Sequence, residues 1–325
     1  MVALRRALGW HRPLIAFAVA MGVLTLVTGL AWSMDGRTLA GAPIWAKPMK
    51  FSVSLLLYAV TLAWMLDRMP HHRRAGWWAG TVVAGAGAVE MAAITGQAVR
   101  GRQSHFNVST PLDSALFSLM GATIAVLYVA TLVVAVLLMR NRSQDPVATW
   151  AVRLGVVVAL VGMSVGGLML TPTPAQTEAF AAGTATLSGA HGVGVPDGGP
   201  GLPLLGWSTT GGDLRVGHFI GMHALQLLPL LALVLSGPRA RRWGTPTRVR
   251  LVQLAAAAYT GVVVLTTWQA LRGRPLLDPD GATVTAAGAL VLLTLVALVV
   301  IARTARTARS DPDRPAPRPV ALDVP

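Results

Sequence analysis

The stretch ALFSLMGATIAVLYVATLVVAVLLM (residues 115–139) has 25 residues and no charged side chain. At 1.5 Å per residue a helix of this length measures about 37 Å, which exceeds the roughly 30 Å hydrocarbon core of a bilayer. In lipid every backbone polar group needs a partner within its own structure, and a helix supplies those partners. This run therefore predicts a transmembrane helix.

Seven other stretches have a similar length and composition, so the sequence predicts an all-α membrane protein with about eight transmembrane helices. The predicted spans are 14–32, 45–66, 77–99, 115–139, 150–170, 216–236, 251–271 and 284–301. Charged residues make up 12% of the chain, about half of what a soluble globular domain carries. The first span is longer than the apolar part of a signal peptide and no clear cleavage site follows it, so we interpret it as a retained helix.

The net charge of +14 does not indicate a nucleic-acid partner, because its distribution follows the predicted spans. With a cytoplasmic N-terminus, 19 of the 27 lysines and arginines fall on the cytoplasmic side, as the positive-inside rule requires. We therefore expect a bacterial cytoplasmic (inner) membrane protein with both termini in the cytoplasm. The chain has no cysteine, which excludes disulfides, thiolate catalysis and cysteine-ligated zinc.

An internal repeat is the main signal of organisation. The third span ends in TGQAVRGR (95–102) and the seventh in TWQALRGR (267–274), with six of eight letters identical at an offset of 172 residues. We predict two parallel four-helix repeats, residues 1–140 and 141–303. Parallel repeats are related by an axis along the membrane normal, and sites tend to lie where they meet.

Two long segments lie outside the predicted helices; the other connections are short. The long outer loop 171–215 belongs to the second repeat, and its Gly, Pro and Thr content predicts little regular structure. A loop of this length is either filler or a cover over a site. The arginine- and proline-rich segment 304–325 reads as a disordered cytoplasmic tail.

A few ionisable residues are expected inside the bilayer, where each is a functional candidate because burying a charge there is costly. Glu90 is the only acidic residue within a predicted span, about nine residues, or roughly 13 Å, below the outer surface. Lys47 and Lys50 are the only lysines of the chain, and Lys50 and His223 fall at a similar depth to Glu90. We predict a Glu90–Lys50–His223 cluster. Gly217 and Gly221, near His223, would let helices approach closely.

The outer ends of the predicted helices add polar and cationic residues, which suit a carboxylate or phosphate group. We expect Gln97 and Gln269 to be symmetry mates across the repeat axis. The complete set of predicted ligand-binding residues is Lys47, Lys50, Glu90, Gln97, Arg100, Arg102, His105, His218, His223, Gln226, Gln269 and Arg272. A metal, if one binds, would be held by residues from among His223, His218, His105 and Glu90.

The motifs KPMKFSVS (47–54), RGRQSHFN (100–107) and GDLRVGHFIGMHALQ (212–226) resemble a group of uncharacterised bacterial polytopic integral membrane proteins. The predicted 4+4 arrangement also resembles haem A synthase in architecture. That family carries histidine ligands on spans two, four, six and eight, whereas here the sixth span, which holds His223, is the only predicted span with histidine.

Three functions remain open from the sequence. The first is binding or transport of a small anionic or amphiphilic molecule in an outward-facing cationic pocket. The second is a membrane enzyme with haem b, or with zinc or another metal held by histidine and Glu90. The third is an accessory subunit without chemistry of its own.

Overall fold

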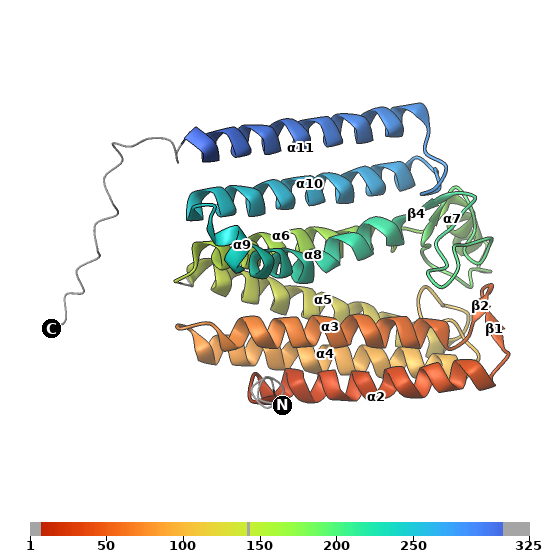
Figure 1. Cartoon of the computed structure of the whole chain (residues 1–325). Helices are drawn as coiled ribbons and strands as arrows, with labels where there is room; N and C mark the ends of the chain where they lie inside the picture. Colours follow the sequence, from red (N-terminus) through yellow and green to blue (C-terminus); the bar gives the residue numbers. More distant parts are fainter. Residues whose placement is uncertain (1–7, 142–143, 308–325) are drawn as a thin grey trace.

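The structure is a computed structural model that describes residues 8–141 and 144–307. Its eight long helices are apolar enough to cross a membrane, which confirms the predicted all-α, multi-pass fold. They are α2 (Arg12–Met34), α3 (Ala46–Asp67), α4 (Arg73–Val99), α5 (Pro111–Arg140), α6 (Pro146–Leu168), α8 (Leu214–Leu235), α10 (Thr245–Leu271) and α11 (Gly281–Thr307). Figure 1 shows them side by side, with the segment between α6 and α8 gathered at one end, which we call the loop end.

Local sequence signals set where several helices begin. The α5 helix has Pro111 in its first turn, and the Thr110 hydroxyl accepts a hydrogen bond from the backbone N–H of Asp113 (3.2 Å). The α6 helix has Pro146 in its first turn, and its Asp145 carboxylate caps the N–H of Val147 (2.9 Å). Proline suits the first turn because that turn's N–H groups lack intrahelical partners, and a side-chain oxygen satisfies one of them.

The helices pack in two groups with the same pattern of neighbours. In the first, α3 contacts α2 and α4, and α4 also contacts α2 and α5; in the second, α8 contacts α6 and α10, and α10 also contacts α6 and α11. The groups meet where α5 packs on α6 and α3 packs on α8. Duplication of the sequence itself stays a prediction, because packing alone does not establish common ancestry.

Glycines bring α8 close to its neighbours, which confirms the packing role predicted for Gly217 and Gly221. A Cβ on Gly162 of α6 would lie 2.6 Å from the Cα of Gly221, and a Cβ on Gly217 would overlap the side chain of Thr267 on α10. Separations this short allow only glycine, so α6, α8 and α10 form one tightly packed unit.

The α11 helix is different because it contacts mainly α10 and has one buried residue, Thr283. Its exposed surface is dominated by leucine and valine. An apolar surface around most of a helix is what a bilayer would cover.

The segment between α6 and α8 is largely irregular, as predicted, but it contains the helix α7 (Pro174–Ala181) and the antiparallel strands β3 (Gly192–Val193) and β4 (Gly212–Asp213). The remaining short elements are α9 (Pro238–Arg241) and the β1–β2 hairpin (Thr38–Leu39 and Ala42–Pro43). The predicted tail begins within α11, which continues to Thr307, and residues 308–325 lie outside the described residues.

Candidate functional site

The site begins at the cap of α4, where the motif QAVRGR ends the helix. Gly101 adopts φ +70°, the N–H of Arg102 donates to the carbonyl of Gln97 (2.9 Å), and the N–H of Gly101 donates to that of Ala98 (3.1 Å). This is a Schellman cap, which needs a left-handed residue and therefore favours glycine. The chain consequently reverses sharply at Gly101.

Buried polar contacts then fix the connection between α4 and α5. Asp113, which is fully buried, accepts hydrogen bonds from Gln97 (2.8 Å), Arg100 (3.0 Å), Ser109 (3.2 Å) and Thr110 (2.8 Å). Four donors on one carboxylate compensate for its removal from water. Gln97 and Arg100, both predicted ligand-binding residues, are therefore part of a structural network.

Residues 103–108 turn back toward the helices, and we call them the inward loop. Ser104, Phe106 and Asn107 are buried. Phe106 has φ +64°, an unfavourable conformation for a bulky side chain, and its ring packs edge-on against Phe117 and His191. Such a conformation costs on the order of 1–3 kcal/mol, and it persists where surrounding packing imposes it, often at functional sites.

The inward loop places His105 beside Glu90. His105 Nε2 lies 3.7 Å from Glu90 Oε1, although Glu90 lies nine residues before the end of α4. Glu90 is 1% exposed. Its Oε2 accepts a long hydrogen bond from Thr123 of α5 (3.4 Å), whereas its Oε1 has no hydrogen-bonding partner among the residues that the structure describes. An unfilled acceptor on a buried carboxylate is unfavourable unless another group supplies a donor.

Lys47 supplies the positive charge of the site. Its Nζ lies 5.8 Å from the centre of the Phe51 ring, and that ring lies 5.6 Å from the ring of His105. The charge of Lys47 interacts most strongly with that of Glu90, and also with those of Asp197 and Arg215. Within the described part of the chain, its ammonium donates no hydrogen bond to a protein acceptor.

Two further imidazoles lie near this group. His191 Nδ1 lies 2.7 Å from Asp197 Oδ2, and His218 Nδ1 lies 2.8 Å from the carbonyl of Gly162. Burial lowers the pKa of His105 well below its usual value, and the charges of Lys47, His191 and His218 lower it further. Burial also lowers the pKa of His191, despite the opposing effect of Asp197. Because both imidazoles therefore favour their neutral forms, Lys47 is the remaining basic side chain of the site.

The predicted Glu90–Lys50–His223 cluster is wrong in two of its three members. Lys50 Nζ donates to the carbonyl of Leu205 (3.0 Å), and its charge interacts chiefly with those of Arg215 and Asp213. Helix rise gives the position of a residue along its own span, but not the direction in which its side chain points. Lys47 and His105, also on the predicted list, take the places beside Glu90.

His223 belongs to a separate polar contact between the two helix groups. Its Nδ1 lies 3.4 Å from Gln226 Oε1, and Gln226 Nε2 donates to Thr61 Oγ1 on α3 (3.3 Å). These residues line the α3–α8 contact at mid-helix. They are joined to one another rather than to Glu90.

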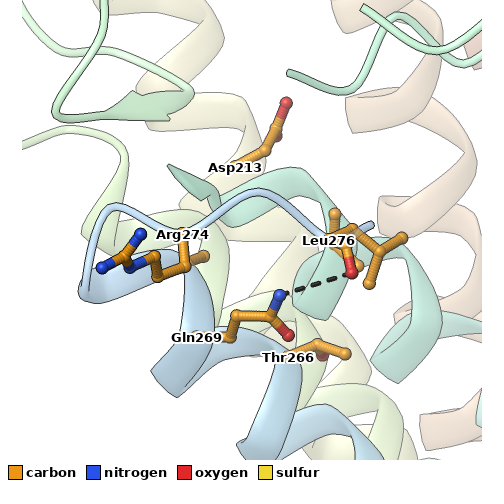
Figure 2. Close-up of a pocket in the computed structure, with 7 residues that line it drawn as sticks. Asp213, Thr266, Gln269, Arg274 and Leu276 are labelled. Carbon is orange, nitrogen blue, oxygen red and sulfur yellow. Dashed lines mark hydrogen bonds between the residues drawn. The ribbon is translucent and has the colours of Figure 1, made fainter. Parts of the chain in front are cut away.

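The second motif, QALRGR, forms the same cap at the end of α10. Gly273 has φ +70°, Arg274 N–H donates to the Gln269 carbonyl (3.2 Å), and Gln269 Nε2 donates to the carbonyls of Pro275 (2.6 Å) and Leu276 (3.3 Å). Figure 2 shows the Gln269 amide directed at the Leu276 carbonyl. The hollow around it has no room for a water molecule. Its lining residues are Asp213, Val216, Thr266, Gln269, Ala270, Arg274 and Leu276.

Most arginines of the predicted outward-facing cationic pocket form ion pairs with aspartates. Arg100 pairs with Asp113, Arg215 with Asp213, and Arg272 with Asp280. Arg102 is exposed and makes no ion pair in the part of the chain that the structure describes. Three arginines at this end of the molecule therefore have acidic partners, whereas Lys47 forms no ion pair among the described residues.

The sequence interpretation missed several contributors, namely Phe51, Phe106, Thr123, His191 and Asp197. His191 and Asp197 lie in the segment between α6 and α8, whose sequence shows neither helical nor strand periodicity. One sequence signal for the inward loop is QSHFN (103–107). It follows the cap of α4 and contains a histidine and a phenylalanine, whereas an exposed turn would be polar throughout. Within residues 8–141 and 144–307, no group of three or more His, Asp or Glu side chains is arranged to hold a metal ion.

Comparison with known proteins finds no matching family, no similar curated protein and no similar solved structure. The site must therefore be interpreted from its own chemistry. It combines a buried carboxylate with an unfilled acceptor, an ammonium with unfilled donors, and neutral imidazoles beside aromatic rings. Such a group can hold a small charged ligand and exchange protons with it.

Proposed function

We propose that this multi-pass membrane protein binds, and carries across the membrane, a small anionic or amphiphilic molecule whose charged group is held by Lys47. The observation that carries the proposal is that one carboxylate oxygen and one ammonium of the same site each lack a hydrogen-bonding partner among the described residues. Glu90 Oε1 is buried without a donor, and the nearby Lys47 ammonium has no protein acceptor among the described residues. Phe51 and Phe106 add apolar surface suited to the uncharged part of such a ligand.

Proton uptake would accompany binding of an anion. The groups that face Glu90 are Lys47 from α3, His105 from the inward loop and Thr123 from α5. Lys47 can neutralise only one negative charge, and two anions in a site shielded from water repel each other strongly. We therefore expect the protonated form of Glu90 to accompany a bound anion, which links binding to pH.

The distribution of arginines supports an orientation with the loop end facing outward and both termini in the cytoplasm of a bacterium. With that orientation, the ligand would meet Lys47 from the outer half of the membrane. The shared pattern of neighbours in the two helix groups supports an origin by duplication. Many carriers are built from repeats with the ligand held between or within them.

The experiment uses benzoate, an aromatic carboxylate, as the probe. Benzoate should raise the thermal midpoint of the purified protein, with a larger shift at pH 5.5 than at pH 7.5, because a bound ligand stabilises the folded state. K47Q should raise the apparent Kd about tenfold or more, since a charge-assisted hydrogen bond contributes about 1.5–3 kcal/mol. E90Q should bind benzoate equally at both pH values.

R102Q is the matched control, because Arg102 is an exposed cation at the same end of the molecule. It should leave the benzoate shift unchanged. The proposal is contradicted if K47Q and R102Q reduce the shift by the same amount, since general positive charge would then explain it. It is also contradicted if E90Q keeps the pH dependence of the wild type.

A second candidate, a haem-binding membrane enzyme, is favoured by one specific contact. The Gly162 carbonyl orients the ring of His218 through Nδ1, which would leave Nε2 available to bind the iron of a haem. His218 would be one ligand, with a second from His191, whose Nδ1 is oriented by Asp197. A Soret band in the purified protein that disappears in H218Q would establish this function and displace the first.

A further inference from the structure

Residues 201–208 form a compact hairpin at the loop end. The hairpin is separate from the group formed by Lys47, Glu90 and His105, which we call the anion site. Gly201 and Ser208 pair across its base, the N–H of Leu202 donates to the carbonyl of Trp207 (2.8 Å), and the N–H of Gly206 donates to that of Leu202 (2.8 Å). At its tip Leu204 has φ +63°, an unfavourable conformation for leucine. The hairpin is thus held in one defined shape by its own hydrogen bonds.

Two cations from different helices hold the tip of this hairpin. Lys50 of α3 donates to the carbonyl of Leu205 (3.0 Å), and Arg215 of α8 donates to the next carbonyl, that of Gly206 (2.6 Å). Arg215 is itself fixed by a bidentate pair with buried Asp213. The hairpin therefore bridges the N-terminal ends of α3 and α8, which belong to different helix groups.

The depth of these contacts fixes the depth of the hairpin. Lys50 is the fifth residue of a 22-residue helix long enough to span a bilayer, and Arg215 is the second residue of another. Long cationic side chains within the first two turns of such helices reach the lipid–water interface. Leu205 contacts Lys50 directly, so the tip of the hairpin lies at that same interface.

The tip presents apolar side chains outward. Leu204 is 76% exposed and Leu205 is 44% exposed, and Trp207, a residue type enriched at membrane interfaces, follows them. Two adjacent exposed leucines at this depth match the acyl-chain boundary of a bilayer better than they match water.

We propose that the hairpin 201–208 is a lipid-contacting element whose leucines insert into the membrane interface, and that Lys50 and Arg215 hold it there. Phospholipid is the partner that the hairpin fits. The two lysines of the chain then have different roles: Lys47 belongs to the anion site, whereas Lys50 positions the hairpin. This inference does not rest on anion binding.

The test uses the natural absence of cysteine, so that one introduced cysteine carries one label. L204C and A182C are each labelled with an environment-sensitive fluorophore and reconstituted into vesicles of phosphatidylcholine and phosphatidylglycerol. Ala182 is exposed and caps the C-terminal end of α7, a helix that lies among the loops at the loop end (Figure 1). Lipids with a nitroxide near the top of the acyl chain should quench the L204C label several-fold more than the A182C label, and aqueous iodide should show the reverse.

Equal quenching of both labels by iodide, with little by the lipid nitroxide, would overturn the proposal. Protection of the L204C label from both quenchers would also overturn it, because a protein partner or a second copy would then cover the tip.

Replacement of each lysine tests the role of Lys50 separately. K50Q should lower the fluorescence anisotropy of the L204C label, because it removes the donor to the Leu205 carbonyl, whereas K47Q should leave the anisotropy unchanged. If K50Q and K47Q give the same anisotropy, Lys50 does not position the hairpin.

Discussion

The ends of α4 and α10 carry almost the same sequence and form the same cap, yet the chain that follows them differs completely. In both, glycine adopts φ +70°, a glutamine is buried beneath the cap, and an arginine pairs with an aspartate at the start of the next helix. After α4 the chain turns inward and delivers His105 to Glu90. After α10 it passes directly over Gln269 into α11.

This difference separates the structural role of the repeated motif from the chemistry near it. A Schellman cap favours glycine at one position, and in both connections an arginine–aspartate pair joins the cap to the next helix. The functional information lies in the residues after the cap. QSHFN brings an imidazole inward, whereas PLLDPD closes a turn.

The largest expected difference in stability is between variants of the two aspartates that pair with the cap arginines, Asp113 and Asp280. D113A removes a fully buried acceptor of four hydrogen bonds, including the shortest one that Gln97 Nε2 donates, so we expect the free energy of unfolding to fall by about 1–3 kcal/mol. D280A should have a smaller effect, because Asp280 is more exposed and mainly caps α11 through Thr283. Chemical unfolding in detergent measures both; equal losses would mean that the two connections are energetically equivalent.

Replacement of the two cap glycines, Gly101 and Gly273, should lower stability by the same amount but affect benzoate binding differently. G101A and G273A each place a Cβ in the left-handed region, which costs about 1 kcal/mol. Only G101A should also weaken the benzoate shift, because the inward loop begins at Gly101. Thermal midpoints with and without benzoate test both variants, and a loss of binding in G273A would show that the α10 connection contributes to the site.

The pH dependence of stability should depend on the inward loop. Because burial lowers the pKa of His105 in the folded state, the unfolded chain binds more protons below about pH 6.5, and stability falls as the pH falls through that value. H105Q should therefore show a smaller drop in thermal midpoint between pH 7.5 and pH 5.5 than the wild type. H71Q, which replaces an exposed histidine at the opposite end, is the control and should keep the full drop.

The smallest effect should come from the last arginine of each motif. Arg102 and Arg274 are both exposed and neither forms an ion pair in the described part of the chain. R102Q and R274Q should each change the free energy of unfolding by less than about 0.5 kcal/mol. A clearly larger loss in either variant, measured by chemical unfolding, would show that this position has a role that the two caps do not share.

The number and length of the helices could be predicted from the sequence because an apolar run of about 20 residues has few alternatives to a membrane-spanning helix. Glu90 was identified for the related reason that acidic residues are rare at that depth. The partners of Glu90 could not be predicted. Helix rise gives depth, but the rotation of α3 and the inward course of residues 103–108 depend on packing among distant segments. That is why Lys50 was chosen in place of Lys47.

The central claim is that Lys47 creates a positive site beside Phe51, Glu90 and His105 that small molecules can reach. The most direct measurement is the reaction rate of a single cysteine in F51C with an anionic and a cationic methanethiosulfonate reagent of similar size. We expect the anionic reagent to react several-fold faster, and K47Q to remove most of that preference while K50Q keeps it. A preference for the cationic reagent, or one that K47Q leaves unchanged, would contradict the claim.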